Sequence, residues 1–211
     1  SFLLCRTALA VDRHGLRLLS AQLISVIFFL IAPLRFSFQR PAIEGIFGDL
    51  FNLLAGFDQP FNQAPSLHIS LLVTIWSKLA QLPNPWRLVV HSWCALIGVS
   101  VLTTYQHHFI DVPTGAAVGL LCLWLWPEQG PSPLAMIKRQ GRQAGKIALL
   151  YTACAALCLL LVWHVQGTAW WLLWPGLAFF LVAGNYSLIG ALGFQKLNGV
   201  RSLAVELLLA P

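Results

Sequence analysis

The hydrophobic positions of this chain form runs longer than those of ordinary buried helices or strands. The apolar runs are separated by short polar or proline-rich stretches and cover 16–34, 66–82, 86–106, 112–126, 147–165 and 168–192. A helix needs about 20 apolar residues to cross a bilayer, and the alternation typical of a membrane β-barrel is missing from these runs. The pattern therefore predicts an all-α, polytopic membrane bundle of about six transmembrane helices.

Three other stretches have a different pattern. In 42–57, apolar side chains recur at helical spacing while Glu44 and Asp49 fall off that face, which predicts an amphipathic helix on the outer membrane surface. Residues 1–15 hold a short apolar piece followed by charges, as in the tail of a span or an interfacial segment. The mixed stretch 193–211 follows the 16–192 core and is expected to be a cytoplasmic tail that leads to a further helix or domain.

Composition supports a membrane protein and narrows the class of partner. Only 9% of the 211 residues are charged and 58% are hydrophobic, whereas soluble domains carry roughly 25% charged residues. The net charge of +6 would suit nucleic acid, but alternating spans place 11 of the 13 basic residues on one side. By the positive-inside rule that side is cytoplasmic. The basic residues therefore indicate topology, and no nucleic-acid partner is expected.

Neither a disulfide nor a metal site is predicted from the cysteines. Their number is odd, they all lie in apolar segments, and the sequence contains no C-x-x-C. Buried cysteines of this kind are usually small hydrophobic residues.

The most informative polar stretch is 105–115, between the third and fourth predicted spans. His107 and Asp111 are four residues apart and would share one face of a helix. A carboxylate there can accept the imidazole Nδ1 proton and leave Nε2 able to attack an electrophile. Ionisable residues at membrane depth are costly unless they have a role. The alternative is a capped helix end at the level of the lipid head groups.

Two other segments reach the same predicted outer face. Arg35 and Arg40 are the two basic residues on that side, and a guanidinium group suits phosphate. Ser66 is a predicted N-cap, and a helix start presents N–H groups to an anion, with His68 in the first turn. One histidine could attack phosphorus while the other protonates the leaving alcohol.

These residues resemble the type 2 phosphatidic acid phosphatase superfamily of membrane lipid phosphatases and phosphotransferases. The pattern of that family has three parts, K-x(6)-R-P, P-S-x-H and S-R-x(5)-H-x(3)-D. The parts can be traced here in the same order, within the six-span core at 16–192, as Arg40-Pro41, Pro65-Ser66-Leu67-His68, and Ser100 with His107 and Asp111.

The resemblance implies a role for each matching residue. His107 would be the nucleophile that forms a phosphohistidine, and Asp111 would orient it. His68 would be the general acid, while Ser66 and Arg40 would bind the substrate phosphate. No metal and no cofactor are implied.

Two cations of the family pattern are replaced in this sequence. Val101 stands in the place of the arginine of the third part, and Pro33 in the place of the lysine of the first. Arg35 could substitute for one of them. His108, Thr104 and Ser100 are further hydrogen-bond donors near the site. Any role of theirs is expected to be indirect, through the residues that contact the substrate.

The implied activity is hydrolysis of a lipid phosphate of the phosphatidic acid, phosphatidylglycerol phosphate or isoprenyl phosphate type. The replaced cations leave two alternatives, a head-group phosphotransferase resembling inositol-phosphorylceramide and sphingomyelin synthases, and a non-catalytic lipid-binding relic. Similarity to bacterial members favours the bacterial inner membrane, with the site on the periplasmic face. A haem protein is disfavoured because His91 and His164 fall in opposite halves of the membrane.

Overall fold

The computed structural model describes residues 1–38, 43–57, 63–137, 142–196 and 201–209, and every regular element in these ranges is helical. The all-α fold predicted from the apolar runs is confirmed. The chain divides into two compact units, Ser1–Cys122 and Leu123–Pro211. We describe each unit by itself.

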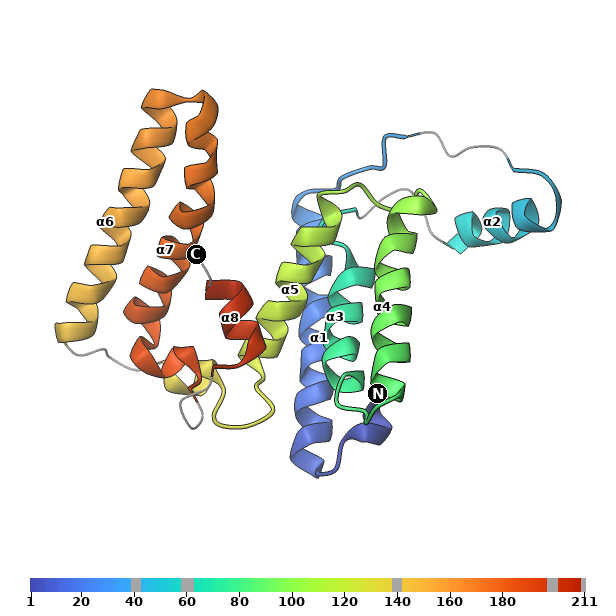
Figure 1. Ribbon diagram of the computed structural model, residues 1–211, viewed down its shortest axis with the longest axis horizontal. Helices are drawn as coiled ribbons and strands as arrows, with labels where there is room; N and C mark the ends of the chain where they lie inside the picture. Colours follow the sequence, from blue (N-terminus) through green and yellow to red (C-terminus); the bar gives the residue numbers. More distant parts are fainter. Residues whose placement is uncertain (39–42, 58–62, 138–141, 197–200, 210–211) are drawn as a thin grey trace. The chain divides into compact units, whose positions relative to one another are not determined.

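The first unit contains the predicted polar site. Its bundle consists of α1 (Ala8–Ile31), α3 (Leu67–Leu79), α4 (Trp86–Thr103) and α5 (Asp111–Leu125). Helix α3 contacts both α1 and α4, and the three run side by side (Figure 1). A small core joins α1 to α5 and is formed by Ala21, Val118 and Cys122, with Ile24 and Leu71 against it. The small side chains of Ala21 and Cys122 allow α1 and α5 to approach closely.

Helix α1 begins earlier than the sequence suggested. A short 3-10 turn, η1 (Phe2–Leu4), precedes it, and the Thr7 side chain caps α1 by accepting the N–H of Ala10 at 3.1 Å. The charged residues near Asp12 therefore lie inside the helix and do not separate two segments. His14 and Arg17 are 1% and 6% exposed, so this part of α1 packs into the unit.

Helix α2 (Gly45–Phe57) occupies most of the stretch expected to be an amphipathic helix. Its apolar residues Ile46, Phe47 and Leu50 are exposed, and none of the other described helices makes a substantial contact with it. Helix formation is therefore as expected from the apolar spacing, while attachment to the membrane surface stays a prediction.

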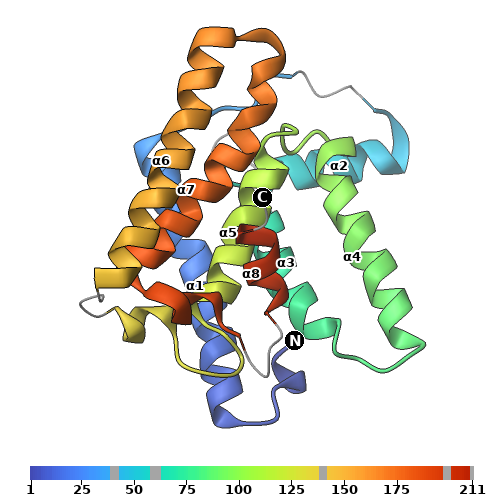
Figure 2. The same ribbon diagram turned by 60° about the vertical axis from the view of Figure 1, so that its left-hand side comes forward.

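The second unit is organised around an antiparallel helix pair. Helix α6 (Arg142–Val165) is followed by the 3-10 turn η3 (Gly167–Leu172) and by α7 (Leu173–Leu188), and Figure 2 shows α6 and α7 side by side. The remaining described elements are η2 (Pro133–Met136), η4 (Gly190–Phe194) and α8 (Leu203–Leu209), of which α8 contacts α7. The sixth predicted run thus ends in a separate turn after Leu188.

Four of the described helices are long and apolar enough to cross a membrane, namely Ala8–Ile31, Trp86–Thr103, Gln143–Val165 and Gly167–Leu188. Helices α3 and α5 are apolar but shorter, with 13 and 15 residues. At about 1.5 Å per residue, each is shorter than the roughly 30 Å hydrocarbon layer. The structure therefore supports a polytopic membrane protein with four candidate spans.

Candidate active site

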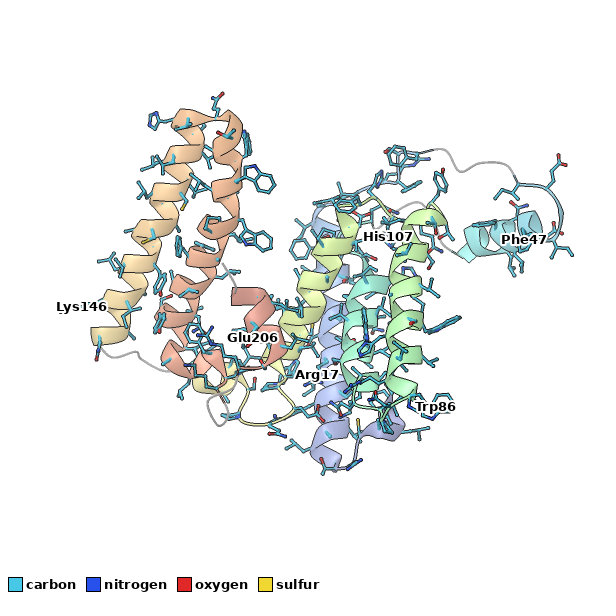
Figure 3. The ribbon with its side chains drawn as sticks, viewed as in Figure 1. Arg17, Phe47, Trp86, His107, Lys146 and Glu206 are labelled. Carbon is cyan, nitrogen blue, oxygen red and sulfur yellow. The ribbon has the colours of Figure 1, made fainter. Side chains whose placement is uncertain are left out.

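The loop between α4 and α5 carries His107. Helix α4 ends with Tyr105 in the left-handed region, at φ 56°. The N–H of Tyr105 donates to the Leu102 carbonyl at 3.2 Å, and the N–H groups of Gln106 and His107 donate to the Val101 carbonyl at 3.1 and 3.0 Å. This is the hydrogen-bond pattern of a Schellman helix end. It reverses the chain and places His107 at the end of the first unit opposite to Trp86 (Figure 3).

Asp111 contacts His107 across the turn that precedes α5. The Asp111 carboxylate is buried, and its Oδ2 lies 3.3 Å from His107 Nδ1. The same oxygen accepts the backbone N–H of His108 at 2.8 Å. The prediction that His107 and Asp111 share one helix face is wrong, since His107 lies in the loop and only Asp111 is helical. The two side chains meet because the turn folds back, with the Asp111 N–H donating to the His108 carbonyl at 3.1 Å.

His68 approaches the other nitrogen of the His107 ring. It lies in the first turn of α3, and its Nδ1 is 3.3 Å from His107 Nε2. The two rings meet edge to face, with centroids 5.5 Å apart. His68 is exposed whereas His107 is only 7% exposed. A carboxylate, a buried imidazole and an accessible imidazole therefore form a chain of three ionisable groups.

Ser66 joins α3 to the start of α5. Its side chain accepts the N–H of Ile69 at 3.3 Å and so caps α3. Its own N–H donates to the Asp111 carbonyl at 3.2 Å, and the residue is fully buried. Ser66 thus has the predicted capping position. Its predicted contact with phosphate stays a prediction.

Two glycines of α5 bring the histidines together. A Cβ at Gly115 would lie 2.5 Å from the Ser66 carbonyl oxygen, and one at Gly119 would lie 2.7 Å from Val73 Cβ. Helices that approach this closely need glycine on the contact face, as in the G-x-x-x-G spacing of membrane helices. This close contact of α5 with α3 fixes the distance between Asp111 and Ser66, and with it the His68–His107 contact.

A cluster that the sequence did not predict surrounds His108. Its Nε2 lies 2.9 Å from the Ser37 hydroxyl. The His108 ring is 4.7 Å from that of Phe36 and 5.1 Å from that of Phe38, measured between centroids. The chain after α1 is therefore held beside the His107 loop. The alternation of aromatic residues in Phe36-Ser37-Phe38 is the signal in the sequence that could have suggested it.

Comparison with known families identifies this architecture. A family model described as the PAP2 superfamily matches residues 14–132, more than half of the chain. The chain belongs to the PAP2 superfamily. Comparisons with curated proteins and with solved structures found no match. Membership supports phosphatase or phosphotransferase chemistry on lipid phosphates in general, and the matched range includes His68, His107 and Asp111.

In this PAP2 superfamily member, the positions at which the family pattern has cations lie in different environments. Val101 is buried, at 2% exposed, within α4. Pro33 and Arg35 are exposed just after α1, and Arg35 lies two residues before the Ser37 that contacts His108. Arg40 lies outside the described residues. The structure thus brings the segment that carries Arg35 close to the His107 loop, through the contact of Ser37 with His108.

The other polar candidates in α4 and at its C-terminal end form hydrogen bonds within the first unit. The hydroxyl of Ser100 donates to the Ile97 carbonyl at 2.8 Å, and that of Thr104 donates to the Ser100 carbonyl at 2.7 Å. His91 Nδ1 accepts the indole N–H of Trp76 at 2.8 Å, as expected of a packed histidine. Within the described ranges, no group of three or more His, Cys, Asp or Glu side chains is arranged to hold a metal ion.

Proposed function

We propose that this chain is a membrane enzyme that cleaves lipid phosphates through a phosphohistidine on His107. The observation that carries the proposal is the line from Asp111 through His107 to His68, with two contacts of 3.3 Å. Each imidazole nitrogen of His107 then has a separate task. Nδ1 faces the carboxylate, and Nε2 faces the accessible histidine.

In the first step, Nε2 of His107 attacks the phosphorus atom of the substrate. The N–P bond forms as the P–O bond to the lipid breaks, and protonated His68 donates its proton to the leaving oxygen. Asp111 accepts the Nδ1–H throughout and stabilises the ring as it gains positive charge. The phosphoryl group must displace His68 from its 3.3 Å contact, and the exposure of His68 supports such a movement.

In the second step, neutral His68 takes a proton from a water molecule that attacks the phosphohistidine. The P–N bond breaks, inorganic phosphate leaves, and His107 Nε2 regains its lone pair. Ser66, at the start of α3, Arg35 and Arg40 would hold the phosphate oxygens, because a helix start and guanidinium groups both stabilise anions. We expect no metal and no cofactor to take part.

The proposed topology has six spans, with α3 and α5 crossing as short helices inside the 16–192 core. By the positive-inside rule, the histidines would then lie on the outer face, which is the periplasmic face if the membrane is a bacterial inner membrane. The exposed apolar residues of α2 support an interfacial helix beside the site. The substrate, a phospholipid or isoprenyl phosphate, would approach His107 from the outer leaflet.

The test is phosphate release by the purified protein from phosphatidic acid, phosphatidylglycerol phosphate and isoprenyl phosphates, in the presence of EDTA. We expect turnover by the wild type and its loss in His107→Ala. His164→Ala is the matched control, because His164 is an exposed histidine in the second unit. Equal rates in His107→Ala and the wild type would refute the mechanism. Binding of lipid without turnover would favour the non-catalytic alternative.

A head-group phosphotransferase is the second candidate function. The observation that favours it is the buried, apolar Val101, which stands where the family pattern has a phosphate-binding arginine. Transfer and hydrolysis differ in what reaches the phosphohistidine, an alcohol or a water molecule. Isotope-labelled acceptor alcohols in the same assay separate the two, since a transferase gives a labelled phospholipid and a hydrolase gives inorganic phosphate.

A further inference from the structure

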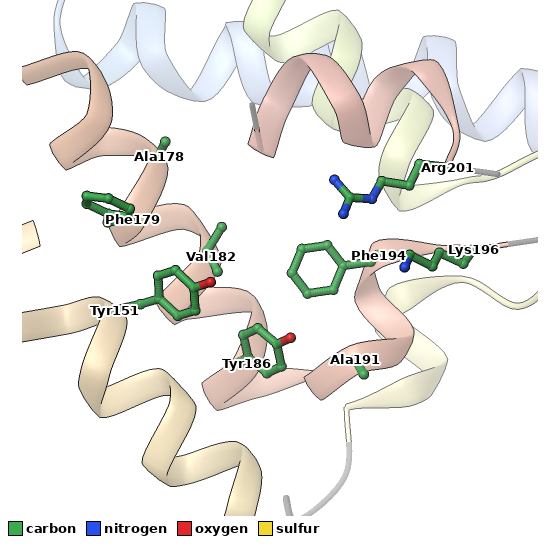
Figure 4. A pocket seen from close by; sticks show the side chains of 9 residues that line it. All are labelled: Tyr151, Ala178, Phe179, Val182, Tyr186, Ala191, Phe194, Lys196 and Arg201. Atoms are coloured by element: carbon green, nitrogen blue, oxygen red, sulfur yellow. The ribbon is translucent and has the colours of Figure 1, made fainter. Parts of the chain in front are cut away.

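The second unit contains a cavity of about 350 Å³ that the proposed chemistry does not use. Its walls come from α6, α7, η4 and the residues that follow η4. The lining residues are Tyr151, Ala178, Phe179, Val182, Tyr186, Ala191, Phe194, Lys196 and Arg201 (Figure 4). All of them lie beyond residue 132, where the family match ends.

Aromatic rings form one wall of the cavity. The rings of Tyr151 and Tyr186 are stacked at 6.1 Å with an interplanar angle of 6°, and Phe194 lies 5.3 Å from Tyr186, measured between centroids. Aromatic rings provide large apolar contact areas, and tyrosine adds a hydroxyl at the polar edge. This wall suits the glycerol backbone and proximal chain of an amphiphile.

Two cations line the other side. The Arg201 guanidinium lies 6.0 Å from the centroid of the Phe194 ring, and Figure 4 shows it extending toward the side where Val182 and the tyrosines lie. Lys196 lies beside Phe194 in the same view. None of the nine lining residues is acidic, and neither cation forms an ion pair with a described residue. The charge of the cavity therefore suits an anion.

The turn η4, which carries Phe194 and precedes Lys196, is held in place by hydrogen bonds. The Trp124 indole N–H donates to the Gly193 carbonyl at 2.9 Å, and the Gln195 side-chain amide donates to the Trp124 carbonyl at 2.6 Å. Asn185 donates to the Gly190 carbonyl at 3.1 Å. These contacts hold η4 on both sides of Phe194, so the wall of the cavity that η4 forms is in place without a ligand.

The cavity lies toward the end of the α6–α7 pair that carries basic residues. Tyr151 lies in the first half of α6 and Tyr186 near the end of α7, and Lys146 lies near the start of α6, at the same end. In the proposed topology this end faces the cytoplasm. Basic pockets between membrane helices on that side bind lipid head groups in other proteins.

We propose that this cavity binds the phosphate group of an anionic phospholipid from the cytoplasmic leaflet. Lys196 and Arg201 would contact the phosphate, while Tyr186 and Phe194 would contact the glycerol and the first part of the chain. The volume falls in the range of about 300–1,000 Å³ typical of ligand pockets and supports a ligand larger than a bare phosphate. This inference is independent of catalysis at His107 and rests on the proposed orientation alone.

The experiment measures binding of dioctanoyl-phosphatidylglycerol to the purified full chain in detergent, by calorimetry and native mass spectrometry. Dioctanoyl-phosphatidylcholine, glycerol 3-phosphate and inorganic phosphate are the comparison ligands. The variants are Lys196→Ala with Arg201→Ala, and Val182→Trp, which fills the cavity. Lys146→Ala is the matched control, because Lys146 is an exposed cation at the same end that does not line the cavity.

We expect one molecule of phosphatidylglycerol to bind, and the double variant to weaken the Kd by at least about 10-fold, the loss of roughly one charge-assisted hydrogen bond. Lys146→Ala and His107→Ala should bind as the wild type does. The double variant changes two exposed side chains and should fold. If Val182→Trp fails to fold, the double variant alone tests whether the cavity is the binding site.

Several results would overturn the proposal. Unchanged binding in the double variant would exclude the cavity as the site. Loss of binding in His107→Ala alone would assign the lipid to the catalytic site. Equal affinity for phosphatidylcholine would make the cavity a general apolar site, and competition by inorganic phosphate at equal affinity would assign it to a soluble anion.

Discussion

Because α5 and α3 are in close contact at Gly115, a side chain at this position should force the two helices apart. In Gly115→Ala, the new methyl group would lie 2.5 Å from the Ser66 carbonyl oxygen and 3.0 Å from Ile69 Cβ. Ordinary contact begins at 3.4 Å, so the two helices must separate by about 0.9 Å at this point. Since Ser66 caps α3 and Asp111 begins α5, the separation should also move His68 away from His107.

Two effects of this separation can be estimated. Overpacking of a well-packed contact costs about 1–3 kcal/mol, partly offset by roughly 1 kcal/mol of helix propensity gained by alanine over glycine. A displacement of about 1 Å in a catalytic constellation lowers the rate by roughly 100-fold. We therefore expect a modest loss of stability and a much larger loss of kcat.

The assay is phosphate release together with thermal unfolding in detergent. Gly98→Ala is the matched control, because a Cβ there would lie 3.7 Å from its nearest neighbour, Leu72 Cδ2, in ordinary contact. It should keep both the wild-type kcat and the wild-type Tm. A Gly115→Ala protein as active and as stable as Gly98→Ala would refute the claim that this contact sets the histidine geometry.

Three further substitutions test parts of the site. Asp111→Asn should lower kcat by about 100-fold to 10,000-fold with little change in KM, since the amide no longer stabilises the His107 tautomer, and an unchanged kcat would contradict this orienting role. Ser37→Ala removes the hydroxyl 2.9 Å from His108 Nε2 and should raise KM several-fold, by about 1 kcal/mol, through loosening of the segment that carries Arg35. Arg35→Ala should raise KM by at least about 10-fold if Arg35 replaces a family cation, whereas unchanged KM and kcat would exclude that substitution. Steady-state kinetics on the preferred lipid measure all three.

The helices of the bundle could be predicted because long apolar runs permit few other structures in a membrane. Helix α4 ends within a few residues of the expected boundary. The cap at Ser66 could be predicted because a serine precedes an apolar run. The start of α1 was not predicted correctly, because the charged residues near Asp12 suggested a break between two apolar segments. In the structure they lie inside a helix capped by Thr7.

The structure brings together His68, His107 and Asp111, which the sequence offered as site candidates, in a geometry that the sequence did not predict. Spacing suggested that His107 and Asp111 share a helix face, but they meet through a turn, which depends on the left-handed backbone at Tyr105. The contact of Ser37 with His108 joins residues 71 positions apart. Such a contact depends on how α1 packs in the bundle, and local patterns carry no information about it.

The central claim is that His107 carries the phosphoryl group during the reaction. The most direct measurement is rapid quenching in alkali of the protein with ³²P-labelled substrate, followed by identification of the labelled peptide by mass spectrometry. We predict acid-labile, alkali-stable label on His107, and none in His107→Ala. Release of phosphate with no labelled protein at any time, or label on another residue, would contradict the account.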